Sequence, residues 1–132
     1  MCSMNCCAPQ VADEESLWRR IYNNPKVNQY VPNGRGGYRV SSAAFHDTMN
    51  QLSVDIASKT TPEKCIEGPP KGDALASLKA KIPKRLGYSV VEDPIPNNPA
   101  HALILGKIRR PDKRKLAASC TWIIPPARTN NH

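Results

Sequence analysis

The chain has 132 residues, of which 39% are hydrophobic, and its formal net charge at pH 7 is +8. This length is typical of one domain, which buries roughly two thirds of the surface of its unfolded chain. No segment reaches the roughly 20 apolar residues that a membrane-spanning helix needs, and no stretch near the N-terminus is typical of a secretory signal. We therefore expect a cytoplasmic protein with no membrane partner.

Residues 1–12 are predicted to form a flexible leader. They contain Cys2, Cys6 and Cys7, three of the five cysteines in the chain. Metal binding and lipidation are the alternatives for these thiols. However, adjacent cysteines do not have zinc-site spacing, and position 2 is not the glycine that myristoylation needs. We expect reduced thiols, no bound metal and no cofactor.

The next segments are predicted to be a helix, a loop and two extended segments. Asp13, followed by two acidic residues, is typical of a helix N-cap and predicts a helix over residues 14–22. Residues 23–38 are rich in Asn, Pro and Gly, which favours a loop. An extended segment is expected over residues 38–45. The alternation of polar and apolar residues over 53–57 predicts a strand with one buried face.

The second half begins with a predicted loop over residues 61–72 and a second helix. Asp73 is placed as its N-cap, Pro83 ends or kinks it, and Gly87 is placed as its C-terminal cap. The apolar residues of this helix recur at spacings of three and four: Leu75, Leu78 and Ile82.

Two strands, over residues 88–92 and 101–108, are expected on either side of a proline-set turn. Asp112 is placed as the cap of a last helix over 113–123, with Leu116, Cys120 and Ile123 facing inward. Residues 125–132 form a polar tail. The pattern predicts a single compact α+β domain over residues 13–124, with a small mixed β-sheet of about four short strands and about three helices.

The excess of positive charge lies in the C-terminal half of the chain. Residues 79–128 contain eleven basic side chains and three acidic ones. Most of the basic ones form two clusters: Lys79, Lys81, Lys84 and Arg85; and Lys107, Arg109, Arg110, Lys113, Arg114 and Lys115. Such a surplus favours nucleic acid or an acidic protein as partner. The alternative is a solvated face that keeps the protein soluble. Few aromatic residues lie nearby, which disfavours base stacking on a single strand.

A glycine-rich segment lies at residues 33–37. Around Arg35, the flexible Gly36 and Gly37 could let backbone amides approach a phosphate. The segment lacks the Gly-Lys-Ser/Thr ending of a P-loop. A flexible surface loop is the alternative interpretation.

Arg39, Ser41 and Ser42 form a second candidate anion site. A guanidinium makes a forked contact with an oxyanion, and a neighbouring hydroxyl adds a donor. The alternative is that the serine pair starts a turn or a short helix over residues 43–48.

His101 is the candidate acid or base of the chain. The turn before it presets the backbone, and histidine transfers protons near neutral pH. Asp93 and Asp55 are the candidate orienting carboxylates. The alternative is a structural histidine that bonds to the turn backbone.

Four sequence blocks together resemble a group of small bacterial proteins. They are Arg39–Phe45, Ser53–Asp55, Asp93–Pro94 and Asn98–Ala102, in this order. The resemblance covers roughly residues 17–123. It implies a bacterial, cytoplasmic setting and directs attention to Arg39, Ser42, Asp55 and His101, but it implies no activity.

From these observations we expect a non-enzymatic module that binds nucleic acid or another polyanion through the two basic clusters. One alternative is an enzyme or nucleotide-binding domain that acts on a phosphorylated substrate or an RNA end. In it Arg39 and Ser41 hold the anion and His101 transfers a proton. Another alternative is an accessory subunit that binds a larger protein through residues 23–38. The oligomeric state stays open.

Overall fold

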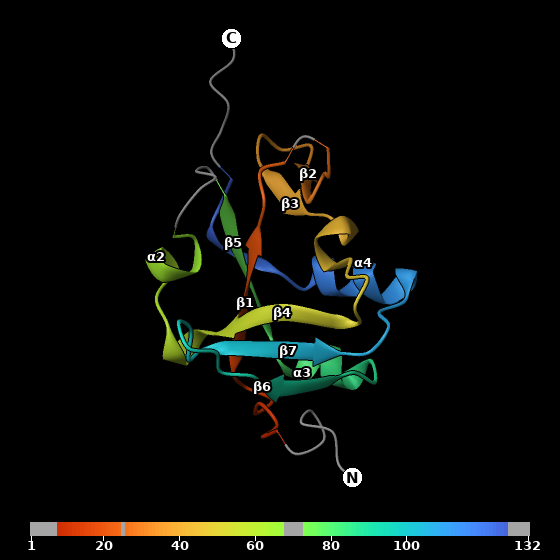
Figure 1. Cartoon of the computed structure of the whole chain (residues 1–132). Helices are drawn as coiled ribbons and strands as arrows, with labels where there is room; N and C mark the ends of the chain where they lie inside the picture. The colour runs from red at the N-terminus through yellow and green to blue at the C-terminus, as the bar shows by residue number, and fades with distance from the viewer. Residues whose placement is uncertain (1–7, 25, 68–72, 127–132) are drawn as a thin grey trace.

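The computed structural model describes residues 8–24, 26–67 and 73–126. The fold is α+β, as expected, with a six-stranded sheet in the order β6-β7-β4-β1-β5-β8 and a separate two-stranded sheet, β2-β3 (Figure 1). There are more strands than predicted. Every strand pairing among the described residues is antiparallel, so the sheet is not mixed.

The strands of the large sheet are short, four to six residues each. They are β1 (Ser16–Ile21), β4 (Gln51–Ile56), β5 (Ala74–Lys79), β6 (Ser89–Glu92), β7 (His101–Leu105) and β8 (Thr121–Ile124). The hairpin strands are β2 (Tyr30–Pro32) and β3 (Tyr38–Val40). The helices are η1 (Ser42–Phe45), η2 (Ala57–Lys59), α2 (Pro62–Cys65), α3 (Lys81–Arg85) and α4 (Arg110–Ala118).

The large sheet bends between β1 and β4. In Figure 1, β1 and β5 run steeply across β4, β7 and β6. β1 pairs with β4 only at Leu17 and Trp18, whereas it pairs with β5 along its whole length. Arg19 bridges the place where β1 and β4 separate. Its Nη1 donates to the carbonyl of Ser53 on β4 at 2.7 Å, and its Nε donates to the carbonyl of Ala44 in η1 at 2.9 Å.

The core lies between the sheet and a layer formed by η1 and α4. Phe45, the single phenylalanine, and Leu116 of α4 are both fully buried. They pack in one cluster with apolar side chains that alternate along the strands, including Leu17, Ile21, Leu52, Val54 and Ile56. This alternation is the period-2 pattern of a sheet with one covered face.

The helix predicted over residues 14–22 is wrong, because this segment is β1. A helix would place Leu17 and Ile21 on one face, and in the strand both are fully buried. A spacing of four places side chains on one face in a strand as well as in a helix. That spacing therefore could not distinguish the two structures.

The helix predicted from Asp73 is also wrong, because residues 74–79 form β5. Leu75 and Leu78 point to opposite faces of this strand and are both buried, so both faces of β5 are covered. Asp73 caps no helix. Its fully buried carboxylate accepts from Arg20 Nε at 2.6 Å and from the Asn23 amide at 2.9 Å.

The last predicted helix is shorter than expected. α4 ends at Ala118, and the β-branched and aromatic run that follows forms β8. Leu116 faces the core as predicted, but Ile123 is 39% exposed. The N-cap of α4 is Arg109, and the carboxylate of Asp112 accepts instead from the hydroxyl of Tyr88.

Other elements agree with the sequence patterns. The strand expected over 53–57 is confirmed as β4, and the two strands around the proline-set turn are confirmed as the neighbours β6 and β7. Gly87 has a φ of 101° and donates to the carbonyl of Lys84, while Tyr88 donates to that of Pro83. These two hydrogen bonds are the Schellman pattern that ends a helix at a glycine. Pro83 itself lies within α3.

Several expected loops and ends contain regular structure. Residues 9–11 of the expected leader run against β6: Gln10 pairs with Val91, and Val11 is 2% exposed. The expected loop over 23–38 contains β2, and the one over 61–72 contains α2. Cys2, Cys6, Cys7 and residues 127–132 lie outside the described residues. Within the described part of the chain, no helix is long and apolar enough to cross a membrane.

Candidate functional site

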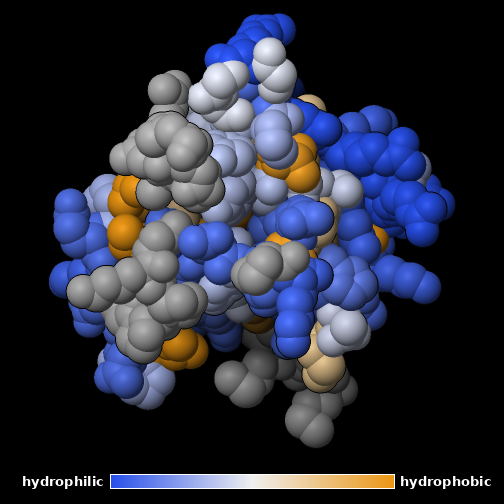
Figure 2. Space-filling model, turned by 90° about the horizontal axis from the view of Figure 1, so that it is seen from above, coloured by the Kyte–Doolittle hydropathy of each residue, from blue (hydrophilic) through white to orange (hydrophobic). Residues whose placement is uncertain are grey.

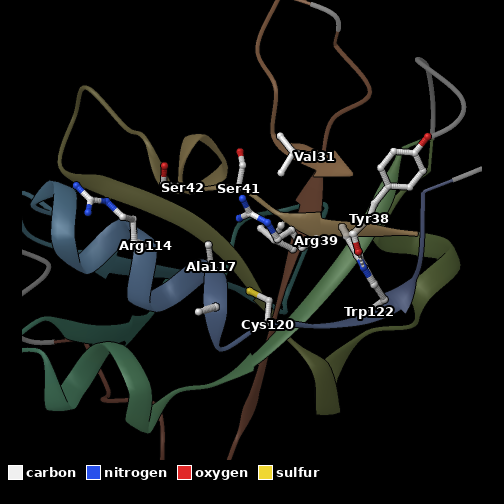
Figure 3. Close-up of a pocket in the computed structure, with 11 residues that line it drawn as sticks. Val31, Tyr38, Arg39, Ser41, Ser42, Arg114, Ala117, Cys120 and Trp122 are labelled. Atoms are coloured by element: carbon white, nitrogen blue, oxygen red, sulfur yellow. Dashed lines mark hydrogen bonds between the residues drawn. The ribbon is translucent and has the colours of Figure 1, made fainter. Parts of the chain in front are cut away.

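One large cavity of the described structure lies between β3, α4 and β8. Its volume is about 610 Å³. Its lining includes two arginines, two serines and two aromatic residues: Arg39, Arg114, Ser41, Ser42, Tyr38 and Trp122. Figure 3 shows Arg114 at one end of this pocket and Trp122 at the other, with Arg39 and the two serine hydroxyls between them. We call it the Arg39–Arg114 pocket.

Hydrogen bonds between elements hold the walls of this pocket. The indole nitrogen of Trp122 donates to the carbonyl of Tyr38 at 2.9 Å and so joins β8 to β3. The rings of Tyr30 and Tyr38 meet edge to face, with centroids 5.0 Å apart. The amide of Ser41 donates to the carbonyl of Gln29 at 2.9 Å. The pocket therefore has a fixed aromatic end.

The two serines have different roles. The hydroxyl of Ser41 donates to the carbonyl of Asn28, so its proton is already used within the protein. Ser42 begins η1 and lines the pocket. The alternative of a helix start is confirmed, because Ser41 caps η1, and both serines also line the pocket. Ser42 is the better hydroxyl donor to an anion there.

Cys120 lines the same pocket but is not a reactive thiolate. Burial raises the pKa of its thiol to about 12. The thiol donates to the carbonyl of Leu116 at 3.3 Å. At neutral pH this side chain is a neutral, partly buried wall of the pocket.

The glycine-rich segment is the tip of the β2–β3 hairpin. The side-chain oxygen of Asn33 accepts from the amides of Arg35 and Gly37, at 2.8 and 3.2 Å. Gly34 and Gly36 have φ values of 80° and 84°, which favour glycine. Two of the backbone amides that could approach a phosphate are thus already hydrogen-bonded to Asn33 within the turn. Arg35 is exposed at the tip.

The basic cluster at residues 79–85 contacts the acidic segment near the N-terminus. Lys81 pairs with Glu14 at 3.3 Å, and Lys84 pairs with Asp13 at 2.9 Å. Lys79 donates to the carbonyl of Glu14 at 3.0 Å. The hydrogen bond and charge of Lys84 lower the pKa of Asp13 below its usual value. Arg85, the remaining member of this cluster, is exposed.

The second basic cluster lies on α4 and the loop before it. Its exposed members are Lys107, Arg109, Arg110, Arg114 and Lys115. Lys113 is half-buried, with its Nζ 3.1 Å from His46 Nδ1. Among residues 8–24, 26–67 and 73–126, no carboxylate forms an ion pair with any of these six side chains. In Figure 2 strongly hydrophilic surface covers the side of the molecule where α4 lies.

His101 lies in a different pocket, at the start of β7. Its Nδ1 is 3.0 Å from both the carbonyl and the carboxylate of Asp93, and its Nε2 is 3.2 Å from the hydroxyl of Ser53. Asp55 is the cross-strand partner of His101, but its carboxylate accepts from the side chain of Asn98 at 2.7 Å. Of the two candidate carboxylates, Asp93 therefore orients the imidazole and Asp55 holds the turn.

The structure does not bring all the predicted site residues together. Arg39, Ser41 and Ser42 line one pocket, whereas His101 and Asp55 line another. Sequence reasoning missed two placements: Arg114 lines the same pocket as Arg39, and the Ser53 hydroxyl lies 3.2 Å from His101 Nε2. The alternation along β4 places Ser53 on the same face as Asp55. The contact with His101, however, depends on the register between β4 and β7.

Comparison with protein-family models, with curated proteins and with solved structures finds no match to this chain. The fold and the sites define a small α+β protein with a basic helix surface next to a pocket lined by two arginines. Its function is therefore inferred from the residues themselves.

Proposed function

We propose that the protein binds nucleic acid through the exposed cations of α4 and the adjoining Arg39–Arg114 pocket. The observation that carries this proposal is the difference between the basic clusters. The cluster at 107–115 is not ion-paired within the described residues, whereas two lysines of the cluster at 79–85 are paired with Asp13 and Glu14. Cations that are not neutralised within the protein remain available for an external anion.

The contacts would be made mainly with the sugar-phosphate backbone. Arg109, Arg110 and Lys107 present charge at the N-terminal end of α4. In the pocket, the guanidinium groups of Arg39 and Arg114 offer forked contacts suited to a phosphate group. Backbone contacts position a protein on nucleic acid but do not read its sequence. We therefore expect binding with weak dependence on sequence.

The aromatic end of the pocket is less suited to base stacking. Trp122 and Tyr38 are both half-buried, and the indole nitrogen is already used in a bond to Tyr38. Proteins that bind single strands by stacking present aromatic faces to successive bases. Duplex DNA and duplex RNA are therefore the first ligands to test.

The test is fluorescence anisotropy with labelled 20-base-pair duplexes over a range of salt concentrations. The variant R109Q/R110Q/R114Q removes three cations of α4. Log K falls linearly with the logarithm of the salt concentration, and each lost phosphate contact should reduce the size of this slope by about 0.9. We expect the slope to fall by about 2 to 3 and the affinity to weaken at every salt concentration.

The matched control is R35Q/K64Q/R85Q, which removes three exposed cations elsewhere and leaves the same net charge. We expect this control to bind nearly as the unmodified protein does. Equal weakening by the two triple variants would show that net charge alone attracts the duplex. Such a result would contradict a site on α4. Competition by polyglutamate as effective as that by DNA of equal charge would indicate an acidic protein partner instead.

A further inference from the structure

Three adjacent strands supply an acid, a histidine and a serine in line. Asp93 follows β6, His101 begins β7, and Ser53 lies in the middle of β4. The imidazole joins the other two side chains, with Nδ1 3.0 Å from the Asp93 carboxylate and Nε2 3.2 Å from the Ser53 hydroxyl. These are the distances and the order of roles in a nucleophilic Ser-His-Asp arrangement.

The surroundings of His101 determine which nitrogen carries the proton. Nδ1 faces two acceptors, the carbonyl and the carboxylate of Asp93. Neither can donate when the carboxylate is ionised, so the proton of the neutral imidazole lies on Nδ1. Nε2 then has a free lone pair directed at the Ser53 hydroxyl. This is the form in which histidine removes a proton from serine.

Ser53 is both exposed and held in place. Its backbone carbonyl accepts from the guanidinium of Arg19 at 2.7 Å, and its strand is paired with β7 on one side. Its side chain is open to solvent, while that of His101 is 17% exposed. A reagent can therefore reach the hydroxyl while the base stays fixed beside it.

A small cavity of about 180 Å³ adjoins this pair. At about 30 Å³ for each water-sized group, it has room for a short acyl chain. Trp18 and Tyr22 contribute aromatic walls, and Arg19 contributes positive charge. Arg20 and Asp55 also line the cavity, but Arg20 is ion-paired with Asp73 and the carboxylate of Asp55 accepts from Asn98. The Arg19 guanidinium, bound to the Ser53 carbonyl, places a positive charge near the serine, which favours the negatively charged tetrahedral intermediate of acyl transfer.

We propose that Ser53 is a nucleophile toward small carboxylic esters, with His101 as its general base and Asp93 as the positioning residue. This activity is separate from nucleic acid binding, because it uses another pocket. The Ser53 oxygen bonds to the acyl carbon while its proton moves to His101 Nε2. The ester C–O bond then breaks, and the alcohol leaves with that proton. Water attacks acyl-Ser53 in the same way and releases the carboxylic acid.

The test is covalent labelling with a small fluorophosphonate, followed by peptide mapping by mass spectrometry. In this reaction the serine oxygen replaces fluoride on phosphorus. We expect one adduct, on Ser53, which is absent in S53A. General-base catalysis contributes about 10²- to 10⁴-fold, so H101Q should label at least about 100-fold more slowly. Acetylation of Ser53 by p-nitrophenyl acetate should depend on His101 in the same way.

The matched control is S89A, which removes an exposed serine on the outer strand β6 and should leave labelling unchanged. D93N tests the positioning role, with thermal unfolding measured in parallel. The Asp93 carbonyl still holds Nδ1 in this variant, so we expect a fall of about tenfold rather than the roughly 10⁴-fold seen when tautomer control is lost. D93E should restore part of the rate.

Two results would overturn the proposal. One is labelling of Ser53 at the same rate in H101Q as in the unmodified protein, in samples with equal unfolding temperatures. The other is no labelling of Ser53 above that of Ser89. Loss of nucleic acid binding in the α4 variant would affect neither readout.

Discussion

The two basic clusters of this protein are alike in composition but differ in their neighbours. The cluster at 79–85 lies beside Asp13 and Glu14, and two of its lysines form ion pairs there. The cluster at 107–115 lies on α4 with its arginines exposed, and its one acidic member, Asp112, is hydrogen-bonded to Tyr88. A run of basic residues therefore indicates a binding surface only when the fold leaves its charges unneutralised.

The largest effect, on the free energy of unfolding, is expected from disrupting the packing that holds α4 and its basic residues against the core. Leu116 is fully buried and anchors α4 to the core. L116A should lower the free energy of unfolding by about 2 to 5 kcal/mol, because it removes buried methyl groups and leaves a cavity. Urea unfolding followed by circular dichroism measures this change. The neighbouring exposed variant K115A should change it by about 0.5 kcal/mol or less.

A loss of less than about 1 kcal/mol in L116A would mean that α4 is not held by the core packing described above. In that case the basic surface would not be a fixed feature of the fold, and the contrast between the two clusters would lose its structural basis.

A smaller effect is expected from single arginines of the Arg39–Arg114 pocket. Hydrogen bonds to charged groups contribute about 1.5 to 3 kcal/mol, and 1.4 kcal/mol corresponds to about tenfold in affinity. R39Q and R114Q should each weaken duplex binding by at least about tenfold. Because both residues line one pocket, we expect the double variant to lose less than the sum of the single losses.

Anisotropy titrations of the four proteins in this double-mutant cycle provide the measurement. R85Q, which removes an exposed cation from the first cluster, is the control and should bind nearly as the unmodified protein does. A loss in R85Q equal to that in R114Q would remove the distinction between the clusters.

The smallest effect is expected from the ion pair of the first cluster. Lys84 lowers the pKa of the Asp13 carboxyl from its usual value of 3.8. A carboxyl whose pKa is lower in the folded state stabilises the protein above its unfolded pKa, and this stability is lost as the pH falls through the folded pKa. D13N should therefore be slightly less stable than the unmodified protein at pH 6. The difference should vanish as the pH falls well below 3.8.

Urea midpoints measured from pH 2 to pH 6 test this prediction. Asp13 is exposed, so 1 M salt should remove most of the difference at pH 6. A difference that is the same at pH 2 and pH 6 would show that Asp13 acts through something other than its charge.

Part of the fold could be predicted because the local patterns were unambiguous. The alternation of β4 and the positions of Gly87 and Leu116 correspond to the structure. β1 and β5 could not be predicted in this way. The spacing of Leu17 and Ile21 suits a helix and a strand equally, and the apolar run of β5 is buried on both faces, a pattern that a strand shares with a buried helix segment.

The candidate sites show the same division. Arg39, His101 and the basic residues of α4 could be selected from their chemical types and local context. The contact of Ser53 with His101 depends on the antiparallel register of β4 and β7, two strands 48 residues apart at this contact. In the same way, Arg114 joins Arg39 only because α4 packs beside β3.

The sequence by itself determined the α+β class, the excess of positive charge and the turn that precedes His101. Tertiary structure alone decided which cations remain without an ion pair among the described residues, and which side chains meet in a pocket. The physical reason is the separation along the chain of the residues that decide each property. Turn preferences and net charge depend on residues close in the chain, whereas neutralisation and site assembly depend on strand register and packing between distant segments.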